Sequence, residues 1–448
     1  MKFFVNNCNR MKFNTILLLS LFGLIADTSG AMAQEKLTLQ QAVQIALENN
    51  YDIKLSSNDV AITKNNVNRA NAGMLPVITG NFSINNTIQN TKQTLSSGQT
   101  QELDGAKNSA INYGPVLNWQ VFDGFAMFAR YEQLKELQKL GETTYKLAIQ
   151  NTIAGVITSY YDLVQQQQQI KALNTALDIS RIRLRNSKSR YEIGKAAKLE
   201  VLAASVDLNT DTTNLLRQRD TYRNTKVRLN ELLARDILTD FTVEDTIIIQ
   251  NDLSLPDLQT ASEQQNPVLQ SALINQRIAE LNLKQVKASR YPEITLNTGY
   301  NFNNSTSQLG FARESSNRGF NYGLTASINI FNGFLQTKNE KNAAILVDSR
   351  KLQLEQTTLN ISSQLATLFQ TYQTNLELVR LEKQNESVAQ QNLNITLEKF
   401  RLGSVAPLEF REAQRNFIDA NTRYTTAQFQ AKLAEISLKQ LVGTLSLQ

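Results

Sequence analysis

The sequence has no histidine and a single cysteine among its 448 residues. Without histidine there can be no Ser-His triad, no histidine-ligated metal and no imidazole acid–base catalyst. The one cysteine, Cys8, precedes an apolar stretch that resembles an export signal, so the exported chain would carry no thiol for a disulfide, a metal or a nucleophile. These absences argue against an enzyme and predict neither a cofactor nor a metal site.

Long hydrophobic runs are also missing. The apolar stretch at 16–25 follows Arg10 and Lys12 and precedes a small-residue cleavage site, Ala31-Met32-Ala33, which predicts a signal peptide at 1–33. Met11 is a second candidate for the first residue. No later run approaches the roughly 18 apolar residues of a membrane helix, so any membrane-spanning part must be made of β-strands.

The charge balance is mild. The net charge is +6 at neutral pH, and no basic patch interleaved with aromatic residues occurs. Proteins that bind nucleic acid usually show such a patch. We therefore expect no nucleic-acid partner.

Proline is scarce, and its positions leave two long gaps. The six prolines leave segments 116–255 and 293–406 without any proline. Because a proline inside a helix costs about 3 kcal/mol, these two segments are where long helices can form. Within these gaps, 126–191 and 338–400 carry apolar residues every three or four positions, the pattern of an amphipathic helix. Each helix would be roughly 100 Å long and must pack beside others.

The chain repeats itself. Val-Phe-Asp-Gly-Phe at 121–125 returns as Ile-Phe-Asn-Gly-Phe at 330–334, and Gly194 returns as Gly403, both at an offset of 209 residues. We predict a first repeat at 34–234, an inter-repeat equatorial segment at 235–256 and a second repeat at 257–443. Each repeat contains a helical segment, a β-hairpin, a long helix, a glycine turn and a return helix. The helical segments are expected at 38–72 and 258–289, and the hairpins at about 76–122 and 292–331.

The hairpins alternate between apolar and uncharged polar residues. After Pro76 the even positions are mostly apolar and the odd positions are mostly Asn, Thr or Ser, with polar loops expected at 89–109 and 304–319. A half-buried sheet of a soluble domain is one interpretation. Lipid outside and a wet lumen inside fit better, because the polar face has hardly any charge. The candidate membrane-interface aromatics are Tyr113, Trp119, Phe122, Phe125, Tyr300, Tyr322, Phe331 and Phe334.

Four strands are too few to close a barrel. Membrane barrels have at least eight strands, and an open edge in lipid leaves unpaired backbone groups that cost several kcal/mol each. Two chains would supply eight strands and three would supply twelve. The sequence therefore predicts an oligomer.

The order of elements and the two glycine turns resemble the TolC-like outer-membrane efflux protein family. The turns read Arg-Tyr-Glu-Ile-Gly at 190–194 and Lys-Phe-Arg-Leu-Gly at 399–403. The resemblance implies a mainly α protein with membrane β-strands: a homotrimer whose 12-stranded outer-membrane β-barrel continues as a long periplasmic α-helical barrel. It implies the exit duct of a tripartite efflux or type I secretion system, located in the outer membrane and extending into the periplasm.

The resemblance also assigns partners and tip residues. The glycine turns would dock a periplasmic adaptor protein, which links the duct to an inner-membrane transporter. The candidate docking residues are Arg190, Gly194, Leu199, Lys399, Gly403 and Leu408.

A gate is implied at the same tips, where the family closes its tunnel with rings of acidic residues. Glu200, Glu409 and Glu412 match the acidic positions, and Glu409 and Glu412 share a helix face because they are three residues apart. An ordinary solvated helix face is the alternative. Phe400 and Val405 occupy positions where some members place a polar latch, so Arg401 and Arg411 are candidates for replacement ion pairs.

The sequence also fits two other functions. One is a structural coiled-coil or adhesion protein of the cell envelope. The other is an envelope enzyme that uses pairs of glutamates.

Overall fold

The computed structural model describes residues 35–308 and 312–445, so the predicted signal peptide lies outside the described residues. The elements in chain order are β1 (Glu35–Lys36), α1 (Leu39–Asn49), α2 (Tyr51–Asn66), β2 (Val77–Thr94), β3 (Thr100–Asp123), α3 (Ala126–Glu192), α4 (Lys198–Leu232), β4 (Phe241–Thr242), α5 (Leu255–Gln265), α6 (Pro267–Ala288), β5 (Glu293–Ser307), β6 (Glu314–Ser327), α7 (Leu335–Arg401) and α8 (Pro407–Val442).

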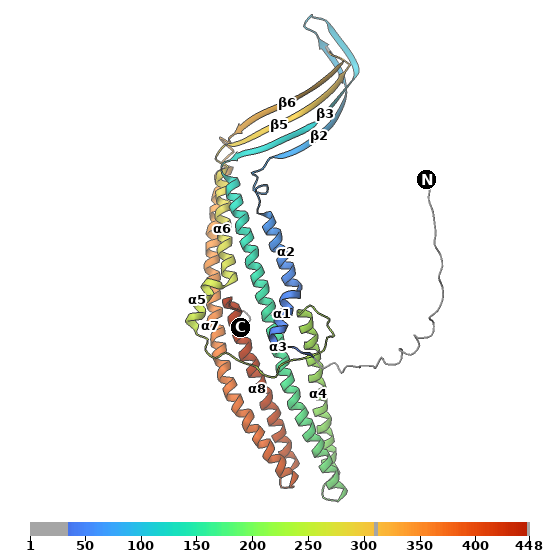
Figure 1. The fold of residues 1–448 in the computed structure, drawn as a ribbon, viewed down its shortest axis with the longest axis vertical. Coiled ribbons are helices and arrows are strands. Elements are labelled where there is room, and N and C mark those ends of the chain that lie inside the picture. The colour runs from blue at the N-terminus through green and yellow to red at the C-terminus, as the bar shows by residue number, and fades with distance from the viewer. Residues whose placement is uncertain (1–34, 309–311, 446–448) are drawn as a thin grey trace, which may run out of the picture.

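The molecule is elongated, with a four-stranded sheet at one end and long helices running away from it (Figure 1). Helices α2, α3, α6 and α7 pack side by side beneath the sheet, each against the next. Farther away, α3 pairs with α4, and α7 pairs with α8. These two pairs form helical hairpins, α3–α4 and α7–α8, whose tips lie at the end opposite the sheet. No helix within 35–308 and 312–445 is long and apolar enough to cross a membrane.

The two long helices agree with the prediction to within a few residues. Helices α3 and α7 each have 67 residues. Both begin in the same way, because Phe125 and Phe334 adopt left-handed φ values of 71° and 63° directly after a left-handed glycine. In both repeats, two consecutive left-handed residues turn the chain sharply into the long helix. The duplication thus extends to the backbone conformation.

Each predicted helical segment consists of two helices that meet at an asparagine. Asn50 caps α2 by accepting from the Asp52 amide at 2.9 Å, and its Nδ2 donates to the Leu232 carbonyl at the end of α4 at 2.9 Å. Asn266, at the matching position of the second repeat, caps α6 in the same way and donates to the Leu441 carbonyl of α8 at 2.6 Å. Both side chains fasten a short helix to the end of a return helix.

The return helices end alike but with different residues. Gly443 has φ 88° after α8, and Ala234, 209 residues earlier, has φ 48° after α4. A left-handed residue with a Cβ costs about 1 kcal/mol. We expect Ala234→Gly to raise the free energy of unfolding by up to about 1 kcal/mol, measured by thermal unfolding of the helical region.

The matched control is Gly443→Ala, for which the opposite sign is expected. A Cβ on Gly443 would lie 2.4 Å from the Gln265 carbonyl oxygen as well as at a positive φ. A lower melting temperature for Ala234→Gly would contradict this explanation.

The sheet is antiparallel and separates its two faces as the alternation predicts. The strand order is β2-β3-β5-β6. Tyr113 lies opposite both Phe82 and Phe302, and its ring stacks on that of Phe302 at 4.8 Å. On the other face Asn112 lies opposite Ser83 and Asn303. In the described residues, β2 and β6 each have one edge without a strand partner.

The hairpin loops are much shorter than predicted. Strand β2 continues to Thr94 and β3 begins at Thr100, and the hydroxyls of these two threonines lie 3.2 Å apart. Strands β5 and β6 likewise run to Ser307 and from Glu314. These strand ends are polar on both faces, so they lack the alternation that reveals a strand, whereas the backbone ladder needs no particular side chain.

The segment between the repeats is fastened to both halves. Strand β4 pairs in parallel with β1, and the Tyr160 hydroxyl donates to Leu37 and accepts from the Glu244 amide at 3.1 Å. On the other side, the Gln250 amide donates to Glu435 at 3.1 Å. Burial would raise the pKa of Glu435, but hydrogen bonds from Lys439 and Lys432 outweigh it and lower that pKa.

Candidate functional site

Two tight turns form the hairpin tips at the end opposite the sheet. Gly194 and Gly403 have φ values of 73° and 74°. The amides of Gly194 and Lys195 donate back to the carbonyls of Tyr191 and Arg190, the pattern of a Schellman motif, and the same pattern recurs around Gly403. Nothing lies within 4 Å of a Cβ built at either glycine. The turns therefore require glycine for its backbone conformation and not for lack of space.

Exposed apolar and basic side chains surround the turns. Leu199 and Leu408 open the return helices and are 75% and 79% exposed. Arg190 and Lys399 stand in the last turns of α3 and α7. The candidate docking residues thus occupy equivalent positions on the two tips.

The three candidate gate carboxylates have different environments. Glu200 lies 3.6 Å from the Arg190 guanidinium of the same hairpin. Glu409 and Glu412 are exposed at the start of α8 and have no ion pair within the described residues. The N-terminal end of a helix favours a negative charge. The second tip therefore carries two uncompensated carboxylates, whereas the first carries one that is compensated.

Phe400 lies apart from these carboxylates. Its ring is buried and stacks on Phe410 of α8, with centroids 4.8 Å apart and an angle of 11° between the planes. Ile179, Leu393 and Phe417 complete the cluster. The structure thus places Phe400 in the packing between α7 and α8, and not on the exposed face of Glu409 and Glu412.

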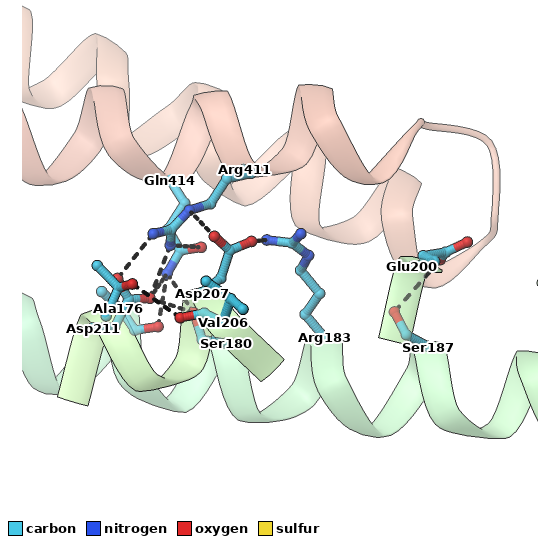
Figure 2. A network of polar contacts seen from close by, with 11 residues as sticks. Ala176, Ser180, Arg183, Ser187, Glu200, Val206, Asp207, Asp211, Arg411 and Gln414 are labelled. Atoms are coloured by element: carbon cyan, nitrogen blue, oxygen red, sulfur yellow. Dashed lines mark hydrogen bonds and ion pairs between the residues drawn. The ribbon is translucent and has the colours of Figure 1, made fainter. Parts of the chain in front are cut away.

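A buried polar network lies next to the tips and joins the two repeats (Figure 2). Arg411 of α8 donates to both carboxylate oxygens of Asp211 on α4, at 2.8 and 3.1 Å. Its Nε also lies 3.5 Å from Asp207, which in turn pairs with Arg183 of α3 at 2.6 Å. Basic and acidic side chains therefore alternate from α8 through α4 to α3, and these three helices come from both repeats.

Hydrogen bonds complete this network. The Ser180 hydroxyl donates to Asp211 at 2.5 Å, and the Gln414 amide donates to the Ala176 carbonyl at 2.8 Å. Asp211 is only 3% exposed, and Gln414 is fully buried. A buried carboxylate is stable only with such partners, so the network holds α8 at a defined position against α3 and α4.

The sequence pointed to only part of this network. Arg411 was one of two candidates for a replacement ion pair, and it pairs across the repeats. Arg401, the other candidate, pairs locally with Glu398 at 2.7 Å. Asp207 and Asp211 were missed, since their spacing of four marks one face of α4 but says nothing about a partner 200 residues away.

Four of the candidate interface aromatics form matching pairs where each β-hairpin meets its long helix. Phe122 and Phe125 make an edge-on contact at 5.0 Å, and Phe331 and Phe334 make the same contact at 5.4 Å. Higher in the sheet, Tyr300 contacts Phe302 at 5.1 Å, and Tyr322 is largely exposed. The Trp119 indole donates to the Met74 carbonyl at 3.0 Å. All of these side chains lie in the sheet or at its junction with the helices.

Comparison with known proteins agrees with this architecture. The family model described as "Outer membrane efflux protein" matches residues 42–235 and 258–444. Outer membrane protein TolC of Vibrio cholerae is 22% identical over 309 residues, covering 68% of this chain and 70% of that protein. TolC of Escherichia coli is 20% identical over 445 residues, covering 96% and 87%. The Campylobacter jejuni CmeC outer membrane channel superposes with a TM-score of 0.76 at 16% identity, covering 91% and 85%, which shows a shared fold.

Proposed function

The chain belongs to the outer membrane efflux protein family, and we propose that it acts as a homotrimeric exit duct of a tripartite efflux or type I secretion system. One observation carries this proposal. The sheet has one apolar face and two open edges, and the chain runs from it into helices of 67 residues. Figure 1 shows the sheet at one end and the long helices running away from it. Such a sheet suits a membrane wall, and such helices suit a tube that crosses the periplasm.

The open edges support the trimer. In lipid, the free edge of β2 must pair with β6 of a neighbouring chain, because unpaired backbone groups are too costly there. Three chains would supply twelve strands and place the uncharged Asn, Thr and Ser face toward a wet lumen. The same arrangement would bring the helices of three chains side by side around that lumen.

The tips support a docking role. Leu199 and Leu408 are large apolar side chains held in water by rigid glycine turns, and a basic residue stands beside each turn. Clustered exposed apolar side chains commonly mark a protein interface. We propose that both tips bind a periplasmic adaptor, which connects the duct to an inner-membrane transporter, and that Glu409 and Glu412 form the principal gate.

The network around Arg411 supports a different closing contact from the one implied by the resemblance. Phe400 and Val405 cannot form polar latching bonds. Arg411 of α8, in contrast, binds Asp211 and Asp207 of α4, and Asp207 pairs in turn with Arg183 of α3. We propose that this network holds the second tip in its closed position. A tip that moves outward would have to break it.

The proposal is tested by measuring conductance. The detergent-purified protein should run as a trimer in native mass spectrometry and should give discrete conductance steps in a planar lipid bilayer. A monomer without conductance would overturn the duct and would favour a structural coiled-coil or adhesion protein. Hydrolase activity lost in Glu409→Ala would favour the enzyme instead.

A further inference from the structure

An open cavity of about 440 Å³ lies between the start of α3 and the end of α6, directly beneath the sheet. Its walls combine aromatic and basic side chains. Phe125, directly before α3, and Phe128 of α3 line one side of the cavity. Lys284 and Lys287 of α6, with Tyr291 just after that helix, line the other side. The volume is within the usual range of small-molecule sites.

The aromatic wall of the cavity continues the apolar face of the sheet. Phe122 lies opposite Ile294 in the ladder, which places it on that face. Its ring contacts Phe125 at 5.0 Å, and Phe125 contacts Phe128 at 6.2 Å and Tyr291 at 6.4 Å. Aromatic rings therefore lead without interruption from the membrane-facing strands into the cavity.

The basic wall carries two cations available to a ligand. Arg277 and Glu132 also line the cavity, but each is engaged: Arg277 pairs with Glu280 at 2.8 Å, and Glu132 pairs with Lys135 at 2.9 Å. Lys284 and Lys287 are exposed and form no ion pair within residues 35–308 and 312–445. Lys287 acts electrostatically on Glu340, but that carboxylate is hydrogen-bonded by the Arg290 guanidinium at 2.9 Å.

The cavity would stay open in a trimer. Strands β3 and β5 are the inner strands of the sheet, and α3 and α6 lie between α2 and α7. Neighbouring chains would join at β2 and β6, on either side. The aromatic continuity places the cavity on the lipid side at the inner surface of the membrane.

We propose that this cavity binds the phosphate of an anionic phospholipid, with Lys284 and Lys287 on the headgroup and the acyl chains along the aromatic wall. The proposal rests on the outer-membrane duct proposed above. The first repeat offers an internal comparison. In the helical segments before the β-hairpins the repeats are offset by 216 residues, as Asn50 and Asn266 are, and the positions equivalent to Lys284 and Lys287 are Asn68 and Asn71, which carry no charge. The duplicated fold would therefore hold one such lipid in each chain and not two.

Native mass spectrometry of the detergent-purified trimer would test this, with titration by phosphatidylglycerol, by zwitterionic phosphatidylcholine and by inorganic phosphate. We expect up to three retained phosphatidylglycerol molecules per trimer and weaker retention of phosphatidylcholine. The double variant Lys284→Gln/Lys287→Gln should bind phosphatidylglycerol roughly tenfold more weakly or worse, because each lysine near an anionic surface contributes appreciably. The control Lys338→Gln/Lys341→Gln removes two exposed charges near the start of α7 and should bind as the wild type does.

Several results would overturn the lipid site. Unchanged binding by the Lys284/Lys287 variant would do so, as would equal retention of phosphatidylcholine. Displacement by inorganic phosphate at equal concentration would show a site for a free anion only. Both double variants should still form conducting trimers, so loss of lipid with normal conductance supports the site. Failure of the wild type to form trimers or to conduct would instead count against the duct itself.

Discussion

Replacing Arg411 with Met is expected to lower the free energy of unfolding by about 3 kcal/mol or more and to raise the basal conductance of the channel. Methionine keeps much of the stem volume but removes the guanidinium that binds both oxygens of Asp211. Asp211 is 3% exposed, so its charge would remain buried beside only Ser180 and Gln414. Removing one partner of a buried pair is far more costly than removing an exposed one.

Two further variants separate stability from gating. Arg401→Met removes a pair with Glu398 that lies at the surface, so it should cost at most about 0.5 kcal/mol. Adding Asp211→Asn to Arg411→Met should recover part of the lost stability, because the buried carboxylate that Arg411→Met leaves without its guanidinium partner is then replaced by a neutral amide. If Arg411→Met destabilises the protein but leaves the single-channel conductance and open fraction unchanged, the network is structural and does not hold the tip closed.

The double variant Glu409→Gln/Glu412→Gln is expected to weaken block by divalent cations roughly tenfold or more. In a trimer the two glutamates would form two rings of three carboxylates. They are exposed and have no ion pair in the described part of the chain, so in the proposed gate no neighbouring cation of the same chain would neutralise their charge. Glutamine keeps the size of each side chain and removes only its charge. The measurement is the concentration of divalent cation that halves the bilayer current.

Glu200→Gln is the matched control. Its carboxylate already lies 3.6 Å from Arg190, so removing its charge should change the block much less. The effect of the double variant should also shrink at high salt, since exposed charges are screened. Equal block in the wild type and in Glu409→Gln/Glu412→Gln would refute the carboxylate gate.

The sequence predicted the elements whose pattern is local. Proline-free gaps and apolar spacing located α3 and α7 to within a few residues, and alternation located the membrane-facing strands. The break at Asn50 was missed because its stabilising partner, the Leu232 carbonyl, lies far away in the chain. The polar ends of β2 and β3 were missed because a ladder can continue without any side-chain period.

The candidate site, like the fold, was predicted only where its pattern is local in the sequence. The glycine turns follow from the repeat itself, and the family match confirms the resemblance that they suggested. The Arg411 network could not be read from the chain, because its members are separated by up to 238 residues in the sequence, as Gln414 and Ala176 are. The position of Phe400 is likewise a matter of tertiary packing, since an aromatic residue at a tip can face either the lumen or a neighbouring helix.

The unpaired edges of the sheet limit how the protein can assemble and how it can be turned over. The helices complete their own backbone hydrogen bonds and can fold in each chain separately, but β2 and β6 cannot be completed without neighbours. For the proposed trimer, insertion into the membrane and association of the three chains should therefore be a single event. In the proposed closed ring, a chain could leave only if two seams, each as long as the 14 residues of β6 at most, opened at once in lipid. Assembled ducts should consequently not exchange subunits, and the cell would replace them whole.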